Sequence, residues 1–232
     1  MRIMLVGYGK MGRLIADLAP HYQCEVAGVV DPVSASHTAP IGDPRWKSVD
    51  VALDFTSPDA VVPNVTALAA QGINIVLGTT GWGAHESELR KIVDDANVGI
   101  VAAPNFSTGV VMFEALVARA AEMFAVQPEF GAWVHEAHHA AKKDAPSGTA
   151  LKLRKAMESA GYPRPIDVSA TRAGYIPGTH TIGFDGPSES ITLTHTARDR
   201  GGFARGALTA ATWVKGRTGW FSMQDVLGIA NR

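Results

Sequence analysis

Six residues near the amino terminus have the spacing of a phosphate-binding turn. An apolar run at 3–6 precedes them, apolar residues at helical spacing follow, and they are Gly7, Tyr8, Gly9, Lys10, Met11 and Gly12. In a G-x-G-x-x-G turn of this kind, the first glycine permits the tight turn, the second lets a pyrophosphate approach the backbone and the third lets the helix pack closely. The segment therefore predicts a dinucleotide site that opens a helix.

Asp31 stands 24 positions after Gly7, at the end of a second β-branched run. A carboxylate there can accept hydrogen bonds from the adenosine ribose, which favours NADH over NADPH as the cofactor. Pro32 follows it, where an arginine would accept a 2′-phosphate, but Lys10 and Arg13 could still supply positive charge. NADPH therefore remains an alternative.

Two further loops follow predicted strands and should line the nicotinamide side, because open α/β sheets bind ligands beyond the carboxyl ends of their strands. The first contains Gly78, Thr79 and Thr80, and the second contains Ala103, Pro104, Asn105 and Phe106.

A dense group of ionisable residues lies between 135 and 150. His138 and Lys142 are four positions apart, a spacing that puts two side chains on one side of a strand or a helix. Ser147, Gly148 and Thr149 resemble a helix start, where free N–H groups receive a carboxylate. Together these residues predict an anion pocket with proton donors.

The same segment contains H-E-x-x-H, from His135 to His139, which is the pattern of zinc hydrolases when it lies on a helix. The preceding residues 130–134 are strand-like, Pro146 leaves little room for a helix, and no third ligand follows at a suitable spacing. We therefore expect no metal site.

The elements that must position these residues alternate between strand and helix in the first half of the chain. Strands are expected at 3–6, 25–30, 51–55, 73–77 and 99–103, with helices between them, which predicts a Rossmann-type parallel sheet. After residue 106 the pattern changes to a helix at 110–124, a strand at 130–135, a helix at 148–159 and antiparallel strands around 166–170 and 190–197. Glycines and prolines between 174 and 187 predict a loop-rich stretch. The second domain is therefore expected to be α+β with a mixed or antiparallel sheet.

The composition of the chain limits the classes of partner, and the cell compartment, that we expect for it. The chain of 232 residues has 21 Lys and Arg against 22 Asp and Glu, a net charge of −1, so nucleic acid is not expected to bind. No apolar stretch reaches the roughly 20 residues that a membrane helix needs. The single cysteine, Cys24, and a strand-like start without a signal-peptide pattern favour the cytoplasm.

The segment 136–150 resembles the signature of the 4-hydroxy-tetrahydrodipicolinate reductase (dihydrodipicolinate reductase) family, E-x-H-x-x-x-K-x-D-x-P-S-G-T-A. Every fixed position is filled, by Glu136, His138, Lys142, Asp144, Pro146, Ser147, Gly148, Thr149 and Ala150. The resemblance extends to residues 7–12, 78–81, 103–107, 172–174 and 221–227. The chain departs from the family pattern at Trp133, where members often have an acidic residue, and at Pro32, where many have an arginine.

The resemblance implies NAD(P)H-dependent reduction of 4-hydroxy-tetrahydrodipicolinate to tetrahydrodipicolinate, in diaminopimelate and lysine biosynthesis. It implies that His138 and Lys142 are the acid pair, with Lys142 the donor, and that the substrate carboxylate is held by His139, Lys142, Ser147, Gly148 and Thr149. It further implies a nucleotide domain of 1–106 and 201–232, a substrate and oligomerisation domain of 107–200, and a homotetramer.

Two other functions remain compatible with the residues. A related imine or amino-acid dehydrogenase, such as an aspartate-dehydrogenase-like enzyme, would share the glycine turn and differ in substrate. A regulatory protein that senses nucleotides would keep Gly7, Gly9 and Asp31 but would not need His138 or Lys142.

Overall fold

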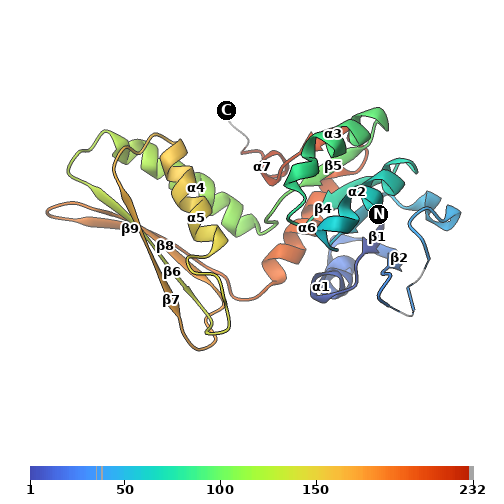
Figure 1. The fold of residues 1–232 in the computed structure, drawn as a ribbon, viewed down its shortest axis with the longest axis horizontal. Coiled ribbons are helices and arrows are strands. Elements are labelled where there is room, and N and C mark those ends of the chain that lie inside the picture. The colour runs from blue at the N-terminus through green and yellow to red at the C-terminus, as the bar shows by residue number, and fades with distance from the viewer. Residues whose placement is uncertain (35, 38, 230–232) are drawn as a thin grey trace. The chain divides into compact units, whose positions relative to one another are not determined.

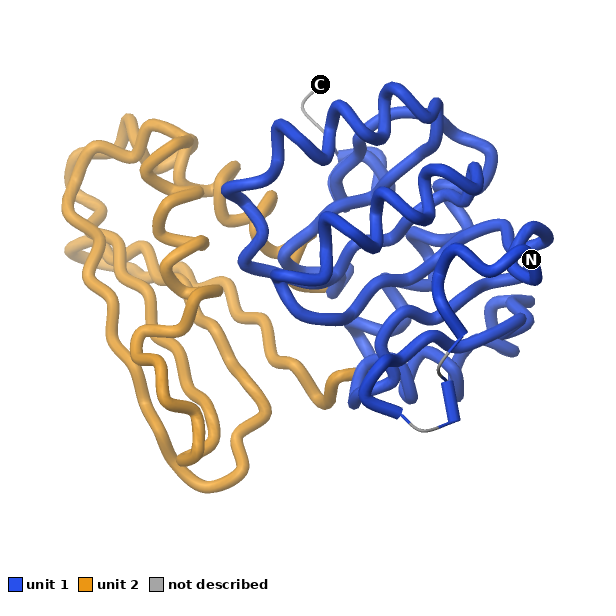
Figure 2. Tube along the Cα trace, turned by 45° about the vertical axis from the view of Figure 1, so that its right-hand side comes forward, with its two compact units in different colours: residues 1–108, 201–232 blue, residues 109–200 orange. Residues whose placement is uncertain are grey.

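The computed structural model describes residues 1–34, 36–37 and 39–229, and its elements are labelled in Figure 1. The chain divides into two compact units, residues 1–108 with 201–232 and residues 109–200, which Figure 2 shows in blue and orange. Residues 230–232, which were expected to belong to the nucleotide domain, lie outside the described residues. The second unit is thus an insertion into the first.

The described part of unit 1 forms a six-stranded parallel sheet in the order β10-β5-β4-β3-β1-β2. Its strands are β1 (Arg2–Val6), β2 (Glu25–Val30), β3 (Val51–Asp54), β4 (Asn74–Leu77), β5 (Gly99–Ala102) and β10 (Gly219–Phe221). Every residue of β3 and β4 is buried, so both faces of the sheet are covered. This arrangement confirms the predicted Rossmann-type sheet.

The helices of unit 1 pack in pairs. Helix α1 lies against α6, and α2 lies against α3. The helices are α1 (Lys10–Leu18), α2 (Pro58–Ala69), α3 (Glu86–Asp95), α6 (Gly201–Val214) and α7 (Met223–Val226), with 3-10 turns at Ala19–Tyr22, Pro44–Ser48 and Gly83–His85. Pro63 lies inside α2, so the N–H that proline lacks is missing from the helix interior.

The described part of unit 2 is a four-stranded mixed sheet, in the order β7-β6-β8-β9, with two helices on one face (Figure 1). Its elements are α4 (Thr108–Ala125), β6 (Gly131–His138), α5 (Gly148–Ser159), β7 (Ile166–Arg172), β8 (Thr179–Asp185) and β9 (Ser190–Thr196). Buried residues from α4, α5, β6 and β8, among them Val117, Leu153, Val134 and Phe184, form one core between the helices and the sheet. The second domain is α+β, as predicted.

Two details of this sheet correct the sequence-based expectation. The strand around 166–170 pairs with β6 in parallel, because α5 carries the chain back across the sheet before β7 begins. Strand β8 lies in the stretch expected to be loop, and it pairs antiparallel with β6 and β9. A glycine suits position 183 of this strand because Trp133 lies opposite it, and a Cβ there would come within 2.1 Å of the indole ring.

Among the helices that the structure describes, none combines the length and the apolar character that crossing a bilayer requires.

Candidate functional site

The glycine turn of unit 1 connects β1 to α1 in the form that the sequence predicted. Gly7 has a φ of +89°, and a Cβ there would come within 2.4 Å of the Phe55 carbonyl oxygen. A Cβ on Gly12 would come within 2.3 Å of the Gly7 carbonyl oxygen. Gly9 caps the helix and has open space where a Cβ would point, so a ligand can approach the backbone at this position.

A cavity of about 690 Å³ opens beside this turn. Its volume lies within the range of small-molecule sites, roughly 300 to 1,000 Å³. Of the predicted nucleotide residues, those that line it are Gly7, Tyr8, Gly9 and Asp31. Its wall also includes His37 and residues 39–42, from the chain after β2, and residues from Phe55 into α2, among them Thr56 and Asn64.

Asp31 is held by the backbone around it. Its Oδ2 accepts a hydrogen bond from the Tyr8 N–H at 2.7 Å, and its Oδ1 accepts one from the Val33 N–H at 2.9 Å. Each carboxylate oxygen keeps a lone pair for a further donor. The Tyr8 ring contacts the His37 ring, with centroids 5.1 Å apart, and the Arg13 guanidinium lies 4.9 Å from the Tyr8 centroid.

The other predicted nucleotide residues do not line this cavity. Lys10, Met11 and Gly12 form the first turn of α1. The loops with Gly78, Thr79 and Thr80, and with Ala103, Pro104, Asn105 and Phe106, follow β4 and β5, at the same carboxyl edge of the sheet as the glycine turn. Thr79 and Phe106 are buried, with Phe106 packed against Phe55.

The buried carboxylate of Asp54, which the sequence did not indicate as a site residue, connects the loop after β4 with the segment around the start of α2. Asp54, fully buried at the end of β3, accepts hydrogen bonds from the hydroxyls of Thr56, at 2.7 Å, and Thr79, at 2.8 Å. The Asn64 amide donates to its other oxygen at 2.8 Å. Burial raises the pKa of the Asp54 carboxyl, and these hydrogen bonds oppose the increase. The sequence placed Asp54 inside the strand expected at 51–55 and gave no signal of this role.

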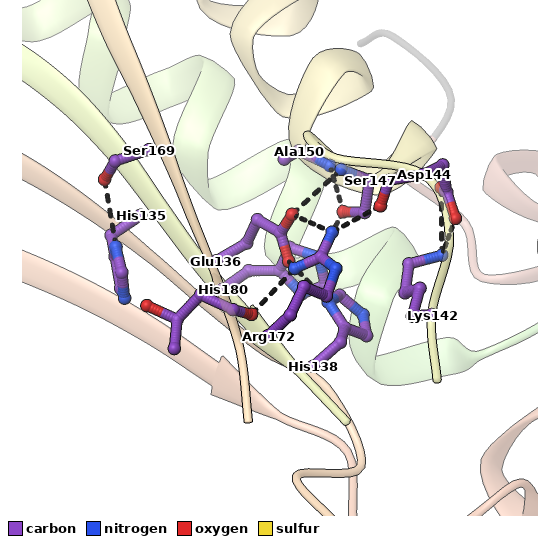
Figure 3. Close-up of polar contacts among 11 residues, drawn as sticks. His135, Glu136, His138, Lys142, Asp144, Ser147, Ala150, Ser169, Arg172 and His180 are labelled. Carbon is purple, nitrogen blue, oxygen red and sulfur yellow. Dashed lines mark hydrogen bonds and ion pairs between the residues drawn. The ribbon is translucent and has the colours of Figure 1, made fainter. Parts of the chain in front are cut away.

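In unit 2, the predicted ionisable cluster lies at the end of β6, in the turn after it and at the start of α5 (Figure 3). His135 and Glu136 are neighbours on a strand, so their side chains point to opposite faces of the sheet. His135 contacts the Ser169 hydroxyl, whereas Glu136 is fully buried. The H-E-x-x-H string therefore lacks the helical geometry in which a zinc hydrolase uses it.

Glu136 is the centre of this cluster. The Arg172 guanidinium donates to both of its oxygens, at 2.9 and 2.6 Å, and the Ser147 N–H donates to Oε1 at 2.9 Å. The His138 Nδ1 contacts Oε2. Burial alone would raise the pKa of the Glu136 carboxyl, but the bonds from Arg172, His138 and Ser147 outweigh it and lower the pKa from 4.5 to about 2.

His180, on β8, adds a buried imidazole to the cluster. Its ring packs edge-on against His138, with centroids 5.2 Å apart, and its Nε2 lies 3.2 Å from the Ser147 hydroxyl. Burial, together with the neighbouring His138, lowers its pKa from 6.5 to about 4. His180 is therefore neutral near pH 7. The sequence gave no indication of it, because this segment was expected to be a loop.

Lys142 lies in the turn after β6, where its Nζ donates to both carboxylate oxygens of Asp144, at 2.7 and 2.9 Å. The Lys142 N–H donates to the His139 carbonyl, so both predicted residues belong to one turn. Hydrogen bonds from Lys142 and from the Gly148 backbone lower the pKa of the Asp144 carboxyl. A carboxylate of this chain thus contacts Lys142 and the start of α5.

Helix α5 begins where the Ser147-Gly148-Thr149 sequence predicted. The buried Ser147 hydroxyl accepts a hydrogen bond from the Ala150 N–H at 3.2 Å and caps the helix. Ser147 is thus bound within the protein by Glu136, His180 and Ala150. Gly148 is exposed, and a Cβ there would meet no atom within 4 Å.

Comparison with known proteins agrees with this architecture. The family models for the N-terminus and the C-terminus of dihydrodipicolinate reductase match residues 1–106 and 109–227. The 4-hydroxy-tetrahydrodipicolinate reductase of Christiangramia forsetii is 34% identical, with 98% of each chain covered. The one of Granulibacter bethesdensis is 37% identical, covering 99% of this chain and 97% of the relative.

Among solved structures, the fold is similar to a dipicolinate-bound dihydrodipicolinate reductase from Paenisporosarcina sp. TG-14. The TM-score is 0.81 and the identity 22%, with 97% of this chain and 98% of that chain covered. An amine dehydrogenase from Mycobacterium smegmatis has a similar fold at a TM-score of 0.68 and 9% identity, with 97% and 95% covered. From the family models and the curated relatives, we conclude that this chain belongs to the dihydrodipicolinate reductase family.

Proposed function

We propose that this protein reduces 4-hydroxy-tetrahydrodipicolinate to tetrahydrodipicolinate with a reduced nicotinamide, a step of diaminopimelate and lysine biosynthesis. The observation that carries the proposal is that the two halves of the reductase family model together account for residues 1–106 and 109–227. The ionisable cluster of unit 2 supports it, because this cluster contains every residue of the family signature between Glu136 and Ala150.

The cavity of unit 1 suits the adenosine and pyrophosphate parts of a dinucleotide. Gly9 leaves its backbone open at the start of α1, and Gly7, Tyr8 and Asp31 line the same cavity. Lys10, Met11 and Gly12 would offer the free N–H groups of the first helical turn to the phosphates. Gly78, Thr79 and Thr80 and the loop of Ala103, Pro104, Asn105 and Phe106 would serve the nicotinamide end. When bound, the nicotinamide supplies a hydride.

The residues of unit 2 would bind the substrate and supply the proton. Loss of water from the substrate gives a conjugated cyclic imine, and addition of a hydride at C4 leaves an electron-rich enamine that must gain a proton. Lys142 is the proposed donor, with His138 as its partner. The turn after β6 and the start of α5 would offer cationic and N–H groups to the reacting ring.

His139, Lys142, Ser147, Gly148 and Thr149 are the proposed substrate-binding residues. The contact of the Asp144 carboxylate with Lys142 and Gly148 supports this proposal, because these groups already bind one carboxylate. Ser147 would contribute by capping α5 and so fixing the direction of the Gly148 and Thr149 N–H groups.

Asp31 is the basis for proposing NADH as the preferred nucleotide. Its carboxylate lines the cavity, and Pro32 and Val33 follow it without a basic side chain. A 2′-phosphate would be repelled by the carboxylate, whereas a ribose hydroxyl could donate to it.

A coupled assay tests both proposals. A synthase supplied with aspartate semialdehyde and pyruvate generates the substrate, and oxidation of NADH or NADPH is followed by absorbance. We expect turnover with both nucleotides and a lower KM for NADH. If neither nucleotide is oxidised when substrate is supplied, the proposed reaction is wrong, and a lower KM for NADPH would contradict the preference alone.

A homotetramer is the proposed assembly. The sheet of unit 2 has one face against α4 and α5, while its other face carries exposed or half-buried polar side chains, including the paired hydroxyls of Thr181 and Thr194. Exposed apolar residues also occur on this unit, among them Leu116 and Met123. Light scattering of the purified protein would test the assembly, and a mass of one subunit would contradict it.

A further inference from the structure

Glu136 has a role that neither substrate contact nor proton donation describes. It is a carboxylate with no exposed surface, held at four points by Arg172 on β7, by Ser147 at the start of α5 and by His138 on its own strand. A carboxylate in such a place is costly unless its oxygens are fully paired. Here Arg172 and the Ser147 N–H supply three of the hydrogen bonds, and the fourth contact is with the His138 ring (Figure 3).

The pairing determines which nitrogen of His138 carries a proton. An ionised carboxylate only accepts hydrogen bonds, so the Nδ1 that contacts Oε2 must be an N–H. The bonds from Arg172 and Ser147 keep the carboxylate ionised at neutral pH, because they lower the pKa of Glu136 to about 2. In the neutral imidazole the proton is therefore on Nδ1, and Nε2 has a free lone pair.

The Nε2 of His138 lies beside a glycine, and the neighbouring imidazole is neutral. Gly178 lies beside it, and a Cβ at that position would come within 3.1 Å of Nε2. The neighbouring His180 is neutral near pH 7 and contacts the Ser147 hydroxyl, so it adds no competing charge. The only atoms of His138 that Glu136 engages belong to the Nδ1 side of the ring.

The same carboxylate also fixes the start of α5 relative to β6. Its Oε1 accepts from the Ser147 N–H, one residue before Gly148, and Arg172 links it to the Asp144 carbonyl. One buried charge thus holds the histidine, the turn and the helix start of the proposed substrate site.

We propose that Glu136 is a positioning residue: it fixes the Nδ1–H tautomer of His138 and holds the start of α5 in register with that histidine. The kinetic part of this inference rests on the proposed function, whereas the tautomer part does not. A carboxylate that orients a histidine by its Nδ1–H is a known means of preparing Nε2 to exchange a proton.

Glu136→Gln tests the proposal. A glutamine has one acceptor oxygen and places an NH2 group against donors, so it cannot hold Arg172, Ser147 and His138 together. We expect kcat to fall by about 10- to 100-fold, as when an orienting partner of a functional histidine is lost. The dissociation constant of NADH, which is measured by fluorescence and depends on unit 1, should stay within about two-fold.

The matched control is Tyr162→Phe. It removes another buried hydrogen bond of unit 2, from the Tyr162 hydroxyl to the Phe130 carbonyl, without touching His138. We expect a lower melting temperature and an unchanged kcat. If Glu136→Gln and Tyr162→Phe lower kcat equally, Glu136 is merely structural and the proposal is overturned.

The tautomer is read directly from ¹⁵N chemical shifts of the histidine rings in the wild-type protein, with assignment by His138→Gln. We expect neutral His138 to be protonated on Nδ1, and protonation on Nε2 would overturn the proposal even if Glu136→Gln does not fold. This readout needs no turnover. A wild-type protein with the Nδ1–H tautomer and no reductase activity would refute the proposed function and not the tautomer assignment.

Discussion

At the scale of single residues, the cluster of unit 2 contains ionisable groups that differ in their charge at neutral pH. Glu136 is kept ionised by its donors, while His180 is kept neutral by burial. Lys142 is paired with Asp144 in a partly exposed turn, where a competing carboxylate can reach it. Substitution of Lys142 and substitution of His180 should therefore change different measurable properties, the first the rate and the second the stability.

Lys142→Met should reduce kcat strongly while leaving nucleotide affinity unchanged. The substitution keeps most of the length of the side chain but removes both the charge and the transferable proton, and a general acid contributes about 10²- to 10⁴-fold to a rate. Steady-state kinetics and NADH titration measure the two effects. Lys143→Met is the control, because this neighbouring lysine is exposed, and normal turnover of Lys142→Met would exclude Lys142 as the donor.

His180 should make the fold less stable as the pH falls. Its pKa is about 4 in the folded protein, against 6.5 in the unfolded chain, so between these values the unfolded chain binds a proton that the folded protein does not. From pH 7 to pH 5 the free energy of unfolding should fall by roughly 2 kcal/mol through this group. Urea titrations at several pH values measure the slope. His180→Gln should flatten it, and parallel slopes would contradict the assignment.

At the scale of elements, the sequence was most informative where hydrophobic periodicity decides the structure. The strand at 25–30 and the helix at 148–159 were predicted with the bounds observed. Strand β8 was missed because Gly178, Gly183 and Gly186 were interpreted as breaks in the structure. The reason for Gly183 lies on another strand, in the bulk of Trp133, and single-sequence patterns contain no pairing information.

Part of the candidate site, like part of the fold, could be predicted from the sequence. Its charged residues and the start of α5 were evident from type and spacing, as were Gly7, Gly9 and Asp31, which line the cavity of unit 1. Asp54 and His180 were not, because their roles come from burial and from partners distant in sequence, such as Thr79 and Ser147. The parallel pairing of β7 was likewise not visible in its alternating pattern.

Gly183→Ala should destabilise the protein by about 1 to 3 kcal/mol, the usual cost of overpacking. The added methyl would meet the Trp133 indole, which must move away from β8. Urea unfolding measures the loss, and the affinity for NADH should not change. Trp133→Leu should remove part of the penalty in a double-mutant cycle, because the two side chains then no longer compete for the same space. Strictly additive effects would show that the two residues are not coupled.

At the scale of the whole molecule, the two predicted functions are divided between units with separate cores. The cavity proposed to bind the nucleotide is lined entirely by residues of unit 1, and the ionisable cluster belongs entirely to unit 2. Substitutions in one unit are therefore expected to leave ligand binding by the other intact. The kinetic and binding measurements proposed above make use of this separation.

The position of β10 has a consequence for how the chain matures during synthesis. This strand completes the sheet of unit 1 beside β5, yet more than a hundred residues, including all of unit 2, are translated between them. Every residue of unit 2 is therefore synthesised before unit 1 has received helix α6 and its last strand, β10. Unit 2 can be folded at a stage when unit 1 still exposes the unpaired edge of β5, and at that stage unit 1 most needs protection from aggregation.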